Sequence, residues 1–489
     1  MKTMKKYIFQ ITAVATLTFG FSSCVKDEYL NPVSLTSLSD ATAFDTKSRI
    51  ENQVYGIYSG LKSGQLLGGR YLIYNDAKAE NFLSNDPNRV TARAAWEFSE
   101  NAADNEVNNL WAAAYTTINR VNVFLEGMEL KGNDVAGADA ARFVAEARFA
   151  RAVAYYSLLQ FYAKPYTDGN GSQPGVPLRL TAIKGGGFND LARSTVGEVY
   201  AQILTDLDFA EQNLALTNGS AVLNTTRAHR NTAIAFKVRT YLSMGKYPEV
   251  ITEANKIVSQ AAPFSASTGV AHALQSNIAT VYTNYSTTES IFSMPFTTND
   301  PPGTQNQLGF YYMPNGTGGA AGIFYLNPNG ILGDADWKAT DARRNLIIQS
   351  GGKDWLAKYT NPGPFLDWTP IMRYSEVLLS LSEAITRTTN SVDTRAVALL
   401  NAVRNRSDAA TTYSVADFAT AADLINAILK ERNIEFLGEG IRSLDIIRLG
   451  MAYPSKSIPG FTVAAVDPGN SAYTWPIPSE EVRYNSLIN

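Results

Sequence analysis

The chain has 489 residues, of which 45% are hydrophobic, 11% aromatic and 18% charged, and its formal net charge is −3. This composition supports a large hydrophobic core and excludes an intrinsically disordered chain. The slight excess of acidic residues argues against nucleic acid or an anionic membrane surface as the main partner.

The N-terminus is typical of a lipoprotein signal sequence. Three lysines precede an apolar run over 7–21, and two serines precede Cys24, the only cysteine of the chain. Signal peptidase accepts small residues before the cleavage point, so residues 1–23 are predicted to be removed. Several acyl chains on Cys24 would then anchor the protein stably to a lipid bilayer. The alternative is a free or buried thiol beside an uncleaved helix.

The next segments alternate between loops and long helices. Residues 24–38 are polar and predict a lipidated tether, and one apolar helical face predicts a helix over 39–61. The glycine-rich stretch 62–70 and the weakly periodic stretch 71–103 predict loops. Two long helices are predicted from apolar stripes, the first through Val107, Trp111, Ala114, Ile118, Val121, Leu125 and Met128 and the second through Phe143, Ala147, Ala150, Ala154, Leu158 and Phe161.

Capping signals mark the helices that follow a proline-containing loop over 164–192. Thr195 and Glu198 form a capping box, which predicts a helix start. A helix over 227–244, then Gly245 and Pro248, resembles a degenerate tetratricopeptide helix pair. The remaining predictions are a strand over 290–296, a long irregular segment over 297–335, and helices over 373–386, 394–406, 421–437 and 443–449.

The sequence offers no catalytic or metal-binding pattern. Only two histidines occur, and no cysteine pair or His-Glu-x-x-His motif is present, so no zinc site, cofactor or catalytic residue is predicted. His229, at a helix start, is expected to be solvated. Glu431 and Glu435 share one helical face, which leaves a surface hydrolase as an alternative. The favoured interpretation is arginine–carboxylate pairing that fixes helix packing, in which we include Arg148, Glu376, Arg404, Arg432, Arg442 and Arg448.

Five segments carry a resemblance to a known family. They are Glu146-Ala-Arg-Phe-Ala-Arg-Ala, Arg373-Tyr-Ser-Glu, Leu400-Asn-Ala-Val-Arg-Asn-Arg, Glu431-Arg-Asn-Ile-Glu-Phe and Pro476-Ile-Pro. Together, and in this order, they resemble the SusD/RagB family of outer-membrane nutrient-binding lipoproteins of Bacteroidetes. The resemblance implies an all-α fold, a tetratricopeptide-like helical-hairpin superhelix with long irregular loops and a few short strands. It also implies a single domain over 39–489, with an N-terminal part over 39–290, a loop-rich ligand face that includes 62–103 and 297–340, and a C-terminal helical part over 370–489.

The resemblance also implies a function. Such a protein is expected to be anchored to the outer membrane through Cys24, to face the cell exterior, and to bind no nucleic acid. It would capture oligosaccharides without cleaving them and deliver them to a partner TonB-dependent transporter of the SusC kind. Lys26, Asp27 and Glu28 are similar to the export signal of such lipoproteins, although an ordinary charged tether would have the same composition. A peptide-binding member of the family is the second interpretation.

The predicted ligand contacts follow from the chemistry of sugars. Sugar rings have apolar C–H faces that stack on flat aromatic side chains, and their hydroxyl groups form hydrogen bonds with amides and carboxylates. Aromatic and polar side chains on the two irregular segments are therefore predicted to bind ligand, with core packing of the loops as the alternative for each ring. The predicted residues are Tyr71, Tyr74, Asn75, Asp76, Trp96, Phe310, Tyr311, Tyr312, Asn315 and Tyr325.

Overall fold

Helices dominate the computed structural model, which describes residues 42–488. The predicted signal peptide 1–23, Cys24 and the tether 24–38 lie outside the described residues. The helices up to the middle of the chain are α3 (Lys47–Leu61), α4 (Arg70–Lys78), α5 (Arg93–Glu97), α6 (Asn105–Gly127), α7 (Asn133–Ala136), α8 (Ala140–Tyr162), α9 (Val196–Asn213), α10 (Ala221–Thr226), α11 (Arg230–Ser243) and α12 (Tyr247–Ala254). The later ones are α13 (Thr280–Thr283), α14 (Leu308–Tyr312), α15 (Tyr374–Thr389), α16 (Thr394–Ser407), α17 (Ala421–Glu435), α18 (Ile441–Arg448) and α19 (Ser479–Tyr484).

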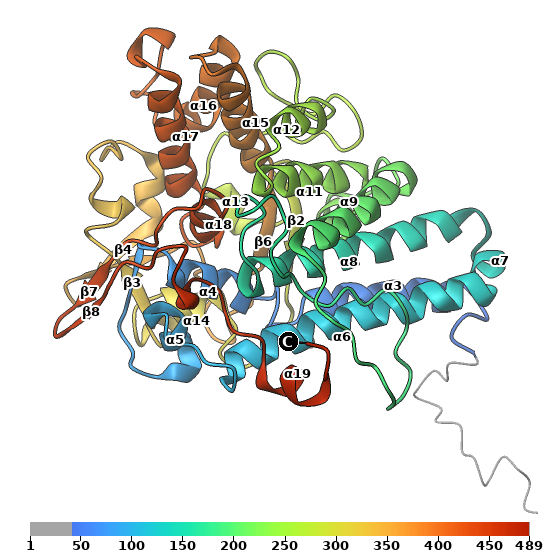
Figure 1. The fold of residues 1–489 in the computed structure, drawn as a ribbon. Coiled ribbons are helices and arrows are strands. Elements are labelled where there is room, and N and C mark those ends of the chain that lie inside the picture. Colours follow the sequence, from blue (N-terminus) through green and yellow to red (C-terminus); the bar gives the residue numbers. More distant parts are fainter. Residues whose placement is uncertain (1–41, 489) are drawn as a thin grey trace, which may run out of the picture.

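The long helices pack on one another largely in chain order. Helix α8 packs against α6 and α9, α11 packs against α9 and α12, and α15 packs against α12, α16 and α17. Figure 1 shows this stack rising from α3 and α6 to α15, α16 and α17. Short connections join α11 to α12 and α15 to α16, as in tetratricopeptide hairpins. The predicted all-α, tetratricopeptide-like architecture is therefore confirmed.

The strands are short and occur in separate antiparallel pairs. These pairs are β1 (Phe82–Ser84) with β3 (Phe324–Leu326), β2 (Ser290–Met294) with β6 (Thr369–Arg373), β4 (Ile347–Ser350) with β5 (Lys353–Leu356), and β7 (Lys456–Ile458) with β8 (Phe461–Val463). In the first pair Phe82 lies opposite Leu326 and Ser84 lies opposite Phe324. This pairing joins the two loop-rich segments that are far apart in the sequence.

Helices α9 and α12 begin where the capping residues in the sequence predict. The Glu198 amide donates to the Thr195 hydroxyl at 3.2 Å, and the Thr195 amide donates to the Glu198 carboxylate at 2.7 Å. This reciprocal pair satisfies two amides at the start of α9 that have no partner within the helix. Pro248 lies in the first turn of α12, where its missing N–H costs no hydrogen bond.

The stretch 71–103 differs from its prediction, because it contains α4, β1 and α5 as well as loops. All nine residues of α4 are buried, including the polar residues Arg70, Asn75, Asp76 and Lys78, whereas residues of these types are usually exposed. The stretch 297–335 is largely irregular, as predicted, but contains the short elements α14 and β3.

A buried ionic cluster joins the C-terminal helices. The Glu435 carboxylate accepts hydrogen bonds from Arg373, Arg406 and Arg343 at 2.6–3.0 Å. Glu431 accepts from Arg343 at 2.5 Å and from Arg404 at 3.0 Å. These pairs satisfy buried charges and fix the packing of α16 and α17, so the predicted scaffold role is confirmed. Further pairs are Arg148–Asp206, Arg239–Glu376, Arg432–Asp445 and Arg448–Glu383.

Candidate functional site

Most of the predicted ligand-binding side chains point into the core. Trp96, Tyr311 and Tyr312 each have 0% of their surface exposed. A ring without an exposed face cannot stack on a sugar, so the structure corrects these predictions and gives the rings a packing role. The same correction applies to the other buried members of the set, which are Tyr71, Tyr74, Asn75, Asp76 and Tyr325.

Several of these buried side chains hold the loop segments together. The Tyr312 hydroxyl donates to Asp76 at 2.8 Å, and the same carboxylate accepts the Gly440 amide at 3.1 Å. Burial raises the pKa of Asp76 to about 7. The Trp96 ring nitrogen donates to the Phe82 carbonyl at 2.9 Å. These contacts fix α14 and the start of α18 to α4, and α5 to β1.

Two predicted residues remain accessible to ligand. Asn315 is exposed, and Phe310 is half-buried with its ring 6.1 Å from that of Phe365. Their predicted contact with ligand stays a prediction.

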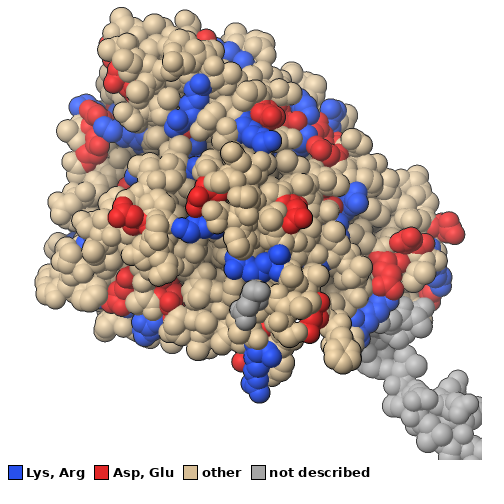
Figure 2. Space-filling view, viewed as in Figure 1, with Lys and Arg blue, Asp and Glu red and all other residues tan. Residues whose placement is uncertain are grey.

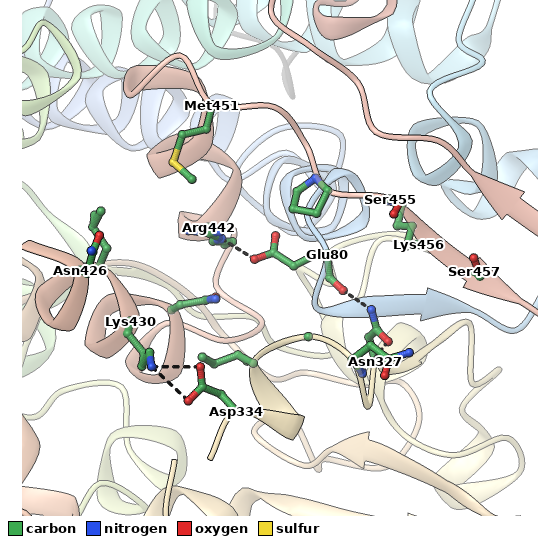
Figure 3. A pocket seen from close by; sticks show the side chains of 16 residues that line it. Glu80, Asn327, Asp334, Asn426, Lys430, Arg442, Met451, Ser455, Lys456 and Ser457 are labelled. Atoms are coloured by element: carbon green, nitrogen blue, oxygen red, sulfur yellow. Dashed lines mark hydrogen bonds and ion pairs between the residues drawn. The ribbon is translucent and has the colours of Figure 1, made fainter. Parts of the chain in front are cut away.

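A polar cleft of about 610 Å³ lies beside the β1–β3 pair. It brings together the end of α4, the loop after β3, one face of α17, the start of α18 and the segment that leads into β7 (Figure 3). Its lining is Glu80, Asn327, Asn329, Gly330, Ile331, Asp334, Asn426, Leu429, Lys430, Asn433, Arg442, Met451, Pro454, Ser455, Lys456 and Ser457.

Four of the five charged groups of the cleft are paired with one another. Arg442 donates to Glu80 at 2.7 Å, and Lys430 lies 3.1 Å from Asp334 (Figure 3). The Lys456 ammonium donates to backbone carbonyls at the end of α4, including that of Lys78 at 3.1 Å. Burial lowers the pKa of Lys456 below its usual range. Because these four charges are paired and Lys456 is buried, the cleft offers a largely neutral polar surface.

The free hydrogen-bonding groups of the cleft include two amides. The side chains of Asn329 and Asn426 are exposed and form no hydrogen bond with the rest of residues 42–488. Asn327, by contrast, is fixed, because its side chain donates to the Glu80 carbonyl at 2.7 Å (Figure 3). Amides that have no partner in the protein can form hydrogen bonds with hydroxyl or peptide groups of a ligand. The cleft therefore suits an uncharged, polar ligand.

The contribution of residues 426–457 was not predicted from the sequence. This region was interpreted as scaffold, and its buried arginine pairs support that interpretation. However, Asn426, Lys430 and Asn433 are spaced so that they share one face of α17. That polar stripe on a helix otherwise packed into the core is the signal that could have indicated the cleft.

The described residues contain neither a metal cluster nor a membrane-spanning helix. No group of three or more His, Cys, Asp or Glu side chains within residues 42–488 is arranged to hold a metal ion. Within the same range, no helix combines the length and the apolar character needed to cross a bilayer.

The fold and cleft define a helical-repeat protein with a loop-built polar site, and known proteins share this architecture. A SusD superfamily protein from Bacteroides fragilis is 33% identical, matches 91% of this chain and 99% of its own, and superposes with a TM-score of 0.81. Two family models match, one described as starch-binding associating with outer membrane over 28–242 and one as the SusD family over 357–489. The chain belongs to the SusD/RagB family.

More distant relatives match over nearly the whole chain. SusD-like protein P2 from Formosa agariphila is 23% identical over 99% of both chains. Surface glycan-binding protein A from Bacteroides thetaiotaomicron, in a structure with laminarihexaose, is 19% identical, covers 90% of this chain and 97% of its own, and has a TM-score of 0.69.

Proposed function

We propose that this protein captures oligosaccharides at the cell surface and delivers them to a SusC-like TonB-dependent transporter in the outer membrane. The observation that carries the proposal is the cleft, in which the unpaired amides of Asn329 and Asn426 face a neutral polar space. The starch-binding description of the matching family model and the laminarihexaose bound to a relative of the same fold support carbohydrate as the ligand.

The proposal includes binding without catalysis. The carboxylates of the cleft are engaged, Glu80 with Arg442 and Asp334 with Lys430, so they hold the walls in place. Capture followed by delivery also requires release, which suits a shallow site of modest affinity.

A peptide ligand is the second candidate. The lining of the cleft contains amide, hydroxyl and aliphatic side chains but no aromatic ring. Stacking on a sugar face is therefore not available in the cleft itself, whereas amide groups pair equally well with a peptide backbone.

Truncation of the free amides tests the site. The double variant Asn329→Ala/Asn426→Ala should bind oligosaccharide about 30-fold more weakly, because each of the two lost hydrogen bonds is worth roughly 1 kcal/mol. Its melting temperature should stay unchanged, since neither side chain has a partner within the described chain. Calorimetry with laminarihexaose, maltohexaose, xylohexaose and cellohexaose measures the loss, and Gln212→Ala on α9, an exposed amide away from the cleft, is the matched control.

The outcomes separate the two candidates. Binding of one of these glycans that weakens only in the double variant supports carbohydrate capture in the cleft. A binding signal in calorimetry with short peptides, and none with any glycan, would show that the ligand is a peptide. Equal glycan affinity in the wild type and the double variant would show that the cleft is not the site.

A further inference from the structure

A second hollow, a groove of about 860 Å³, lies along α6 and shares no lining residue with the cleft. One wall is formed by the loop over 179–189 and the other by α19 and its flanking residues. Figure 1 shows α19 beside α6, whereas the cleft lies by α17, α18 and β7. The groove is thus a separate feature of the fold, built from segments outside the predicted ligand face.

Side-chain hydrogen bonds fix both walls of the groove. The Asn119 side chain accepts the Ile183 amide at 2.8 Å and donates to the Ile183 carbonyl at 2.9 Å, which holds the loop on α6. Arg179 of the loop lies 3.3 Å from Glu481 of α19. The Asn485 side chain pairs with both backbone groups of Leu191 at 2.8 and 2.9 Å. The groove is therefore formed before any ligand arrives, which lowers the entropic cost of binding.

The aromatic rings that the cleft lacks are present here. Trp111, Tyr115 and Tyr484 all line the groove, and Tyr484 has 69% of its surface exposed. Trp111 is buried and Tyr115 is half-buried, so Tyr484 offers the main flat apolar surface for the C–H face of a sugar. Tyr484 is one of the most exposed large apolar side chains of the described chain, although the Arg483 guanidinium lies 5.0 Å from its ring centroid.

Polar groups with spare hydrogen-bonding capacity surround these rings. Asn109 and Thr116 are exposed on the α6 face of the groove, and the Asn109 side chain has no hydrogen-bond partner among residues 42–488. The buried Asn108 Oδ1 also lacks a partner there. Arg120 reaches only the Gly56 carbonyl, at 3.4 Å. Donors and acceptors next to exposed rings are the combination that recognises sugar hydroxyl groups and ring faces together.

The groove continues along α6 beyond its main volume. An adjoining hollow of about 490 Å³ shares Asn119 and Arg120 with it and is bordered by Gln53 and Ile57 of α3. The α6 residues that line the two hollows run from Asn108 to Phe124. This stretch of helix is roughly 24 Å long, enough for several sugar units in line.

We propose that the α6 groove is a second oligosaccharide site, in which Tyr484 stacks on a sugar ring and Asn109 binds its hydroxyl groups. This inference rests on the proposed function, because it assumes that the chain binds oligosaccharide at all. A second site on the same chain holds two segments of one polymer, and the second contact is then intramolecular, so overall affinity for long chains exceeds that of either site.

Counting the bound hexaose tests the second site. The full chain is dialysed to equilibrium against each of the four glycans named above, labelled and at saturating concentration. The wild type should bind about two molecules of glycan per chain, and Tyr484→Ala/Asn109→Ala should bind about one. The cleft variant Asn329→Ala/Asn426→Ala should also lose one equivalent, and the quadruple variant should lose both. Tyr484→Phe keeps the ring and should keep two. Val482→Ala, an exposed residue of α19 that does not line the groove, is the matched control.

Each result decides between the proposals. Loss of one equivalent in the groove variant, with an unchanged melting temperature and an unchanged control, supports the second site. A single equivalent in the wild type, an unaffected groove variant, or an equal loss in Val482→Ala overturns it and leaves the cleft untouched. Absence of binding with all four glycans overturns both proposals.

Discussion

Single residues show how tertiary surroundings override the chemistry expected from sequence. His229 was expected to be solvated, but it is buried, with 0% of its surface exposed, and its ring stacks on that of His272 with centroids 5.2 Å apart. His272 in turn lies against Tyr374, at 6.1 Å. A helix start is usually accessible, yet this one is covered by the loop that carries His272. The two rings therefore behave as neutral core residues.

This histidine pair should make stability depend on pH. Burial lowers the pKa of His272 to about 4 and holds that of His229 well below its usual range. The unfolded chain then binds more protons than the folded chain below about pH 6.5, so stability is full above that pH and falls as the pH drops toward 4. We expect His272 alone to cost about 2 kcal/mol at about pH 5. Urea unfolding at about pH 7 and about pH 5 measures the change.

Phenylalanine variants isolate this effect from other titrating groups. His229→Phe and His272→Phe keep a flat apolar ring in place and should each reduce the difference in stability between the two pH values. Wild-type and variant proteins with the same pH dependence would show that the histidines do not contribute.

At the scale of elements, close backbone contacts position the long loop on the helices. A methyl group on Gly64 would lie 1.9 Å from the Pro302 carbonyl oxygen, and one on Gly69 would lie 1.8 Å from that of Asn306. Arg70, at the start of α4, donates to the Asn306 side chain at 3.0 Å. The connection between α3 and α4 is therefore glycine-rich because a distant segment lies directly on it.

Gly69→Ala should detach this segment. The added methyl group cannot fit beside a backbone oxygen, so we expect a loss of about 1–3 kcal/mol, as for other overpacked sites. Amide hydrogen exchange should increase over 302–306, and thermal unfolding should report the lost stability. Gly185→Ala is the control, because a methyl group there meets no atom within 4 Å. An unchanged exchange rate in Gly69→Ala would contradict the close contact.

At the scale of the whole molecule, surface charge and the proposed lipid anchor are the two features that could attach the protein to a membrane. Figure 2 shows acidic and basic side chains interspersed over the face in view, without a continuous basic patch. Attachment to the membrane is therefore proposed to depend on the acylated Cys24 rather than on charge. Cys24→Ser should move the protein from the outer-membrane fraction to a soluble fraction and protect it from protease added to intact cells. Membrane retention of this variant would contradict lipid anchoring.

Much of the architecture could be predicted from the sequence. Helix periodicity and the capping box at Thr195 depend on residues that are close in the sequence. The structure confirms the helices that they predict. The carboxylates Glu431 and Glu435 were correctly assigned to scaffold pairs. Helix α4 is not predicted because it is short and contains Arg70, Asn75, Asp76 and Lys78, which the tertiary structure buries.

The amino-acid sequence by itself determined the family and the succession of helices, because both depend on residue types at fixed local spacings. Only the tertiary structure decided which side chains remain free. Trp96 and Tyr311 are of residue types that contact ligands, but segments hundreds of residues away in the sequence cover them. Tyr484, on the short helix α19, remains exposed. Exposure is set by what packs on a residue, and that information lies in the assembled chain.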